Sequence, residues 1–157
     1  MSPTVAKRVK VGDVVEIATK KGLAYALYTH RDPQWGALLR VTDGLFETTP
    51  ADLNAVVKRP LLFSAFFPLQ QAVNQGIVSV VGTVPVPDDL SEFPTFRSGP
   101  IDPVTKKVSS WWLWDGREQW QVQALSSVQR TFPLREIVND TLLIQRIENG
   151  WKPEIES

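Results

Sequence analysis

The stretch that decides the fold runs from residue 11 to residue 42 and reads VGDVVEIATKKGLAYALYTHRDPQWGALLRVT. β-Branched and aromatic residues recur in it with a loose period of two, which is typical of half-buried strands. We therefore predict a hairpin of two strands, residues 11–19 and 23–31, that turns at Lys20–Gly22. A third strand is expected at Ala37–Val41, so that an antiparallel meander opens the chain.

The middle of the chain predicts two helices and two further strands. Thr49-Pro50-Ala51-Asp52 combines a capping residue, a proline at the first helical position and an acid in the first turn. These signals predict a short helix that ends near Val57. Strands are expected at Leu61–Phe66 and Ile77–Val84, separated by a short helix at Leu69–Gln75. We expect these two strands to lie in the centre of the sheet.

Residues 85–103 read PVPDDLSEFPTFRSGPIDP and predict a long loop stiffened by proline. Loops of this length in compact domains tend to be functional or disordered, and the phenylalanines favour a packed loop. Its acidic residues lack the alternate spacing and the glycine of a calcium loop. We expect them to be solvated or to meet a basic partner; they are Asp88, Asp89 and Glu92.

Residues 109–122 read SSWWLWDGREQWQV and hold four of the six tryptophans. Asp115-Gly116 predicts a hairpin turn. Strand alternation places Trp112 and Trp114 on one face and Trp111 on the other, so the indoles cannot all serve one ligand. We expect Trp112 and Trp114 to face inward, and Trp111 and the turn to lie nearer a partner. The predicted partner-binding residues of the hairpin are Trp111, Trp112, Trp114, Asp115 and Arg117.

Residues 125–157 predict helical structure. Asn139 or Asp140 is a suitable N-cap, and Gly150 a suitable end. The apolar face of this helix would contain Leu142, Leu143 and Ile147, with Arg146 and Glu148 outside.

Composition narrows the classes of partner and of chemistry. The 157 residues fit one domain, residues 1–157, and 17 basic residues balance 17 acidic ones. Neither nucleic acid nor an anionic membrane is therefore an expected partner. The chain has no cysteine, which excludes disulfides and thiolate metal sites. No apolar segment follows the basic start, so we expect a cytoplasmic protein.

The supply of catalytic groups is small. His30, the only histidine, could act as a general base beside Asp32, but a solvated histidine at a strand end is the more usual case. We predict no catalytic residue, no metal site and no cofactor. A small-ligand or sugar-binding module that uses the tryptophan faces remains an alternative.

The predicted fold class is α+β. We expect a mainly antiparallel curved sheet or small barrel of about six or seven strands. Two or three short helices and a C-terminal helix would pack on it.

Three stretches together resemble the immunity protein 26 family: residues 10–32, residues 76–97, and WWLWDG followed by NDTLLIQRIENGW. The resemblance spans most of the chain, although its motifs are mostly turn and packing residues. It implies a bacterial protein that binds and neutralises a cognate polymorphic toxin without catalysis. Similar proteins are sometimes labelled small phosphotriesterases, which makes a hydrolase the enzymatic alternative. Such hydrolysis usually needs a metal-activated hydroxide or a strong base, and one histidine without cysteine favours binding.

Overall fold

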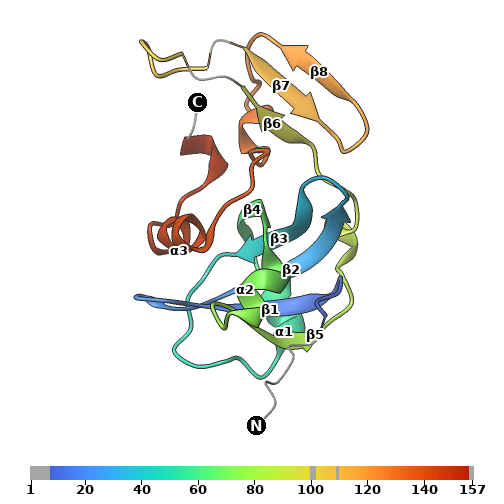
Figure 1. Ribbon diagram of the computed structural model, residues 1–157, viewed down its shortest axis with the longest axis vertical. Coiled ribbons are helices and arrows are strands. Elements are labelled where there is room, and N and C mark those ends of the chain that lie inside the picture. Colours follow the sequence, from blue (N-terminus) through green and yellow to red (C-terminus); the bar gives the residue numbers. More distant parts are fainter. Residues whose placement is uncertain (1–7, 100–101, 109, 156–157) are drawn as a thin grey trace.

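The computed structural model describes residues 8–99, 102–108 and 110–155 of the chain. It shows an α+β protein with two antiparallel sheets (Figure 1). One sheet has five strands in the order β4-β3-β2-β1-β5, and the other has three in the order β6-β7-β8. The predicted α+β class is confirmed, but the strands divide between two open sheets, and the described residues form no barrel.

The first three strands form the predicted meander. β1 (Asp13–Thr19) pairs with β2 (Gly22–Asp32), and β2 pairs with β3 (Gly36–Thr42). Gly22 begins β2 with a φ of +139°, and a Cβ there would lie 3.1 Å from the Phe46 carbonyl oxygen. The turn before β2 therefore requires glycine at this position.

The next two strands occupy the edges of the sheet, so the prediction that they are central is wrong. β4 (Leu61–Phe67) pairs with β3, and β5 (Ser79–Thr83) pairs with β1. Short turns already join β1, β2 and β3 as neighbours, which leaves only the outer positions for later strands. The outer edge of β4 is partly covered, because the Val138 N–H donates to the Phe66 carbonyl oxygen at 2.9 Å.

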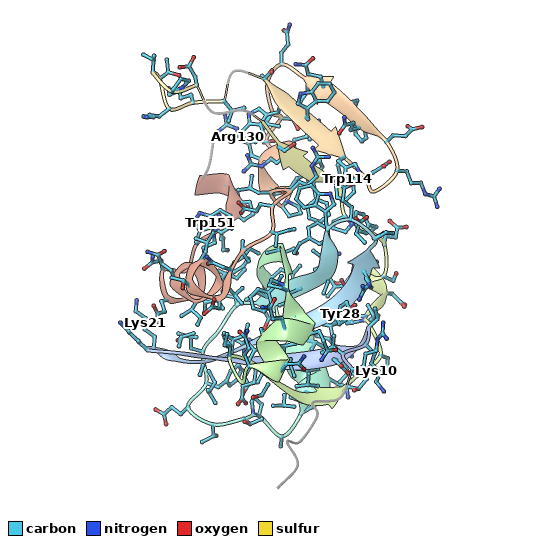
Figure 2. All side chains as sticks on the ribbon, in the orientation of Figure 1. Lys10, Lys21, Tyr28, Trp114, Arg130 and Trp151 are labelled. Carbon is cyan, nitrogen blue, oxygen red and sulfur yellow. The ribbon has the colours of Figure 1, made fainter. Side chains whose placement is uncertain are left out.

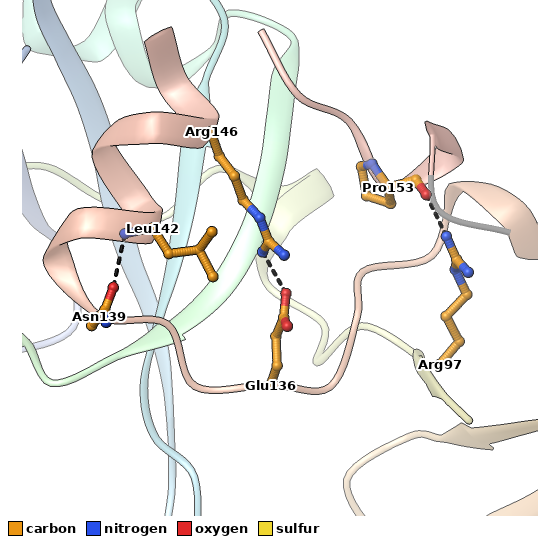
Figure 3. Close-up of polar contacts among 6 residues, drawn as sticks. All are labelled: Arg97, Glu136, Asn139, Leu142, Arg146 and Pro153. Atoms are coloured by element: carbon orange, nitrogen blue, oxygen red, sulfur yellow. Dashed lines mark hydrogen bonds and ion pairs between the residues drawn. The ribbon is translucent and has the colours of Figure 1, made fainter. Parts of the chain in front are cut away.

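The predicted helices are present, with some changes at their ends. They are α1 (Leu53–Val57), α2 (Leu69–Asn74) and α3 (Asp140–Glu148). The N-cap of α3 is Asn139, whose side-chain oxygen accepts the Leu142 N–H at 2.8 Å (Figure 3). No described helix is long and apolar enough to span a membrane.

The described chain between β8 and α3 contains no α-helix, so the helical prediction for it is wrong; its last part, residues 132–139, is extended. Only a short 3-10 helix, η2 (Gln129–Thr131), occurs between β8 and α3. The Pro133 carbonyl oxygen accepts the Arg97 N–H at 2.9 Å, and the following residues bridge to β4. Strand-like pairing with both sheets therefore holds this segment extended. A second 3-10 helix, η3 (Pro153–Ile155), follows α3.

Arg146 of α3 also differs from the prediction, since its side chain is not outside. Its guanidinium forms an ion pair with Glu136 (Figure 3). The same group lies 3.9 Å from the ring centre of Trp151. Arg146 therefore ties α3 to the segments on either side of it.

The proline-rich segment is more ordered than the predicted loop. It contains a 3-10 helix, η1 (Asp88–Leu90), and strand β6 (Phe96–Ser98). β6 pairs with β7 (Trp111–Trp114), which pairs with β8 (Gln119–Val122) as the predicted hairpin. The tryptophan hairpin thus belongs to a sheet of its own.

Three groups of apolar side chains hold these layers together. One face of the five-stranded sheet packs against α2 and α3, and the other packs against α1 and the η1 segment. The third group joins the two sheets; it consists of Leu38, Phe66 and Phe96, with Trp35, Phe93 and Trp114 packed against them. The Phe66 and Phe96 rings are stacked with their centres 5.0 Å apart.

Candidate protein-binding surface

The turn of the tryptophan hairpin is shaped by Asp115. Its carboxylate accepts the N–H groups of Arg117 at 2.9 Å and Glu118 at 2.8 Å. These bonds stabilise the charged form and lower the pKa of Asp115 below its usual value. Gly116 follows with a φ of +94°, which suits glycine in a tight turn. Asp115 is therefore a structural residue that presents Arg117 and Glu118 to solvent.

Trp111 lies inward, so the prediction that it is nearer a partner surface is wrong. Its side chain is 6% exposed and Leu113, on the same face, is 1% exposed. The guanidinium of Arg97 lies 4.5 Å from the Trp111 ring centre. Alternation paired these residues correctly but could not show which face the rest of the chain covers.

Arg97 explains why this face is covered. It is fully buried, and its Nε–H donates to the Phe132 carbonyl oxygen at 3.2 Å. Another guanidinium nitrogen donates to the Pro153 carbonyl oxygen, as Figure 3 shows. Arg97 therefore holds the C-terminal part of the chain against the small sheet, over Trp111.

Trp112 and Trp114 are half-buried, on the opposite face of the hairpin. The Trp114 ring packs at 5.4 Å against Phe93, edge to face. The guanidinium of Arg135 lies 5.4 Å from the Trp114 ring centre. Figure 2 shows Trp114 between the two sheets, which confirms that it faces inward. Trp114 thus packs against the apolar group that joins the two sheets.

Trp120 is an exposed tryptophan that is not among the predicted partner-binding residues. Its side chain is 40% exposed, because β8 is an edge strand. It lies between Gln119 and Gln121, which are also exposed. In the sequence, the glutamines on both sides of Trp120 could have indicated that this strand is exposed.

The acidic residues of the proline-rich segment are presented by η1. Leu90 is 7% exposed and packs beneath the segment, whereas Asp88, Asp89 and Glu92 are exposed. The Ser91 hydroxyl donates to the Asp88 carbonyl oxygen at 2.7 Å, which fixes this turn. Burial of one leucine therefore keeps three carboxylates on the surface.

The two predicted segments meet in space. Phe93 contacts Trp114, and Gly116 lies so near the Phe93 ring that a Cβ there would be 2.9 Å from it. The acidic turn of η1 and the turn of the hairpin therefore border one another. We call the charged residues of these two turns the hairpin–loop surface: Asp88, Asp89, Glu92, Asp115, Arg117 and Glu118, of which Asp115 is half-buried and the others are exposed. It carries five carboxylates and one guanidinium.

A polar network beneath this surface involves His30, which is half-buried and bonded, not solvated as predicted. A carbonyl oxygen can only accept, so Nε2–H of His30 donates to the Ser91 carbonyl oxygen at 2.9 Å. Nδ1 then accepts the Thr29 hydroxyl at 2.8 Å, and that hydroxyl oxygen accepts Nε–H of Arg40 at 3.2 Å. Burial lowers the pKa of His30 below its usual value. The histidine therefore fastens the η1 segment to β2.

Arg40 brings a buried positive charge under the acidic residues. It is 5% exposed, and burial lowers the pKa of its guanidinium to about 10, although the nearby Asp89 carboxylate opposes this shift. Its Nη2–H donates to the Glu92 carbonyl oxygen at 3.4 Å. Arg40 therefore favours negative charge in the η1 segment above it.

Asp32 does not orient His30. Its carboxylate accepts the N–H groups of Gln34 and Trp35, both at 2.9 Å, and so shapes the turn between β2 and β3. Within the described ranges, no group of three or more histidine, aspartate or glutamate residues is placed to hold a metal ion.

Comparisons with protein-family models, with curated proteins and with solved structures give no match. The resemblance to the immunity protein 26 family therefore stays a prediction from the stretches quoted above.

Proposed function

We propose that this chain is a non-catalytic immunity protein that binds and neutralises a bacterial toxin through the hairpin–loop surface. The observation that carries the proposal is the contact of Phe93 with Trp114 and Gly116. It joins two segments, each predicted to bind a partner, into one continuous surface. The family resemblance supplies the class of partner.

The chemistry of the surface suits a basic protein partner. Its carboxylates would attract a positively charged surface and increase the association rate. Trp120 is not one of the six residues of this surface and lies on the other face of the hairpin, across from Leu113. It is exposed at the edge of the same hairpin, where a partner that extends around β8 could bury it, and tryptophan is enriched at interface hot spots. An inhibitor needs only such a complementary surface, of about 800 Å² on each side.

The bonding of His30 also supports binding over hydrolysis. Both of its ring nitrogens are engaged, one by Ser91 and one by Thr29. A general base needs a free lone pair within reach of the proton that it accepts. His30 would have to break its bond to Thr29 before it could act as a base.

The test is binding of the purified chain to the toxin encoded beside its gene, measured by calorimetry. Reversing the charge at two exposed carboxylates, Asp88→Lys with Glu92→Lys, should weaken binding by about tenfold or more. A matched double variant, Glu47→Lys with Glu154→Lys, changes exposed carboxylates outside the surface and should bind normally. Equal losses in both variants, or no binding by the unmodified chain, would contradict the proposal.

Two assays address the alternatives. Turnover of a chromogenic phosphotriester that disappears in His30→Ala would show a hydrolase and overturn the proposal. Glycans that quench tryptophan fluorescence in the unmodified chain but not in Trp120→Phe would show a sugar-binding module. We expect neither signal.

A further inference from the structure

A second surface lies at the β5 edge of the five-stranded sheet, at the opposite end of the molecule from the β7–β8 hairpin (Figure 1). β5 pairs with β1 on one side, and its other side pairs with no described strand. Ser79, Val80 and Thr83 are exposed along it, and Val80 is 37% exposed. An uncovered edge strand presents N–H and C=O groups that can pair with another strand.

A groove of about 620 Å³ runs beside this edge. β5 forms one wall, and Val73, Gly76 and Val78 continue the lining toward α2. Arg8 and Lys10 complete it from the N-terminal segment. This segment is held in place because the Val9 N–H donates to Gln70 Oε1 on α2, at 2.8 Å. The groove thus combines a strand edge, apolar side chains and two cations.

The charges of the groove are unbalanced. Arg8 and Lys10 are exposed. The ion pair found among the described residues joins Arg146 to Glu136, which do not line the groove. The one acidic residue of the lining is Asp13, which is 4% exposed. Its carboxylate oxygens accept the Thr83 hydroxyl at 2.8 Å and the Lys10 N–H at 2.9 Å. Asp13 therefore fastens β5 to the N-terminal segment and offers little charge to a ligand.

We propose that β5 binds an extended acidic peptide segment of a partner protein as an additional strand. Main-chain hydrogen bonds along β5 would provide affinity, as in other cases of strand addition. β-Branched side chains of the peptide would contact Val73 and Val80, and its carboxylates would pair with Arg8 and Lys10. A second copy of the chain fits less well, because its own cations would meet those of the first.

The probe is a fluorescein-labelled peptide of about seven residues, long enough for one strand, with alternating valine and glutamate. Its binding to the full chain is measured by fluorescence anisotropy. Two control peptides should each bind at least about tenfold more weakly. One has lysine in place of glutamate, and the other is the glutamate peptide with alternate N-methylated amides. Equal binding of the glutamate and lysine peptides would overturn the proposal.

Variants of the chain locate the site. Arg8→Glu with Lys10→Glu should weaken binding of the glutamate peptide by about tenfold, because two exposed attractions become repulsions. Lys107→Glu with Lys152→Glu, which changes exposed lysines outside the groove, should have no effect. Val80→Glu removes an apolar contact, places a like charge beside the glutamates of the peptide and should weaken its binding by a similar factor.

Amide hydrogen exchange gives the direct readout. Binding of the glutamate peptide should slow exchange within residues 79–83 of the unmodified chain. Protection elsewhere without protection at residues 79–83 would overturn the proposal. A dimer of the chain that Val80→Glu converts to monomer would also overturn it. None of these variants changes the hairpin–loop surface, so toxin binding and peptide binding are tested separately.

Discussion

The two sheets are held in different ways. The five-stranded sheet buries apolar side chains on both faces along most of its length, as the packing against α1, α2 and α3 shows. The three-stranded sheet has few buried side chains, and every residue of β8 is exposed or half-buried. Figure 2 shows the contrast between the large lower body and the small upper sheet. Many buried apolar side chains therefore stabilise the five-stranded sheet, whereas a few buried side chains stabilise the three-stranded sheet.

This difference has a functional consequence. The hairpin–loop surface lies where the small sheet meets the η1 segment, and Phe93, Trp114 and His30 connect it to the larger body. Regions with few buried apolar contacts open locally at lower free energy than the core of a protein. We expect the binding surface to open before the five-stranded sheet does.

The largest effect is expected where the two sheets meet. Phe66 is fully buried and packs on Phe96, Trp35 and Trp114. Phe66→Ala should lower the free energy of unfolding by about 3–5 kcal/mol, measured by urea denaturation. Val128→Ala, at a residue 66% exposed, is the control and should change it by less than about 0.5 kcal/mol. A similar loss in both variants would contradict the role of Phe66.

The second effect should be confined to the small sheet. Arg97→Met removes the donors to the Phe132 and Pro153 carbonyl oxygens and the cation above Trp111. We expect a loss of about 2–4 kcal/mol, because buried acceptors are left without these bonds. Hydrogen exchange should quicken in β6 and β7 more than in β2. Equal acceleration in β2 would show that the two sheets are not held separately.

A third, smaller effect is expected at the N-cap of α3, which packs on the five-stranded sheet. Asn139→Ala loses the bond to the Leu142 N–H and should cost about 1 kcal/mol. Asn139→Asp retains a side-chain acceptor and should be nearly neutral in a thermal unfolding experiment. If both substitutions were neutral, the cap would not contribute to stability.

The smallest effect is the pH dependence from His30. Its pKa is lowered in the folded chain, so the unfolded chain binds more protons at pH values between the lowered pKa and about 6.5. Stability should therefore fall as the pH falls below about 6.5 and should be fully present above it. His30→Gln retains a donor for the Ser91 carbonyl oxygen but does not titrate, and should remove this component. An unchanged pH profile in the variant would contradict the assignment.

The sequence predicted the local structure well where the signal itself is local. Alternation located β1, β2 and β3, Asp115-Gly116 located the hairpin turn, and the cap of α3 was narrowed to Asn139 or Asp140, of which Asn139 is the cap. Each of these features depends on residues close together in the chain.

The failures involve contacts between distant segments. Three-residue strand β6 lies among prolines, and its pairing with β7 carries no local pattern. Trp111 is covered through Arg97 by carbonyl groups of residues 132 and 153, which alternation cannot reveal. The contact between the η1 segment and the hairpin turn also joins residues far apart in the chain. The sequence therefore predicted both segments of the candidate surface but not that they lie side by side.

The most direct test of the central claim is hydrogen exchange of the unmodified chain with and without the toxin encoded beside its gene. The proposal predicts slower exchange at residues 88–92 and 115–120 in the complex. Residues 79–83, on the separate β5 edge, should exchange as in the free chain. Unchanged exchange at the hairpin–loop surface in a chain that binds the toxin would contradict the account.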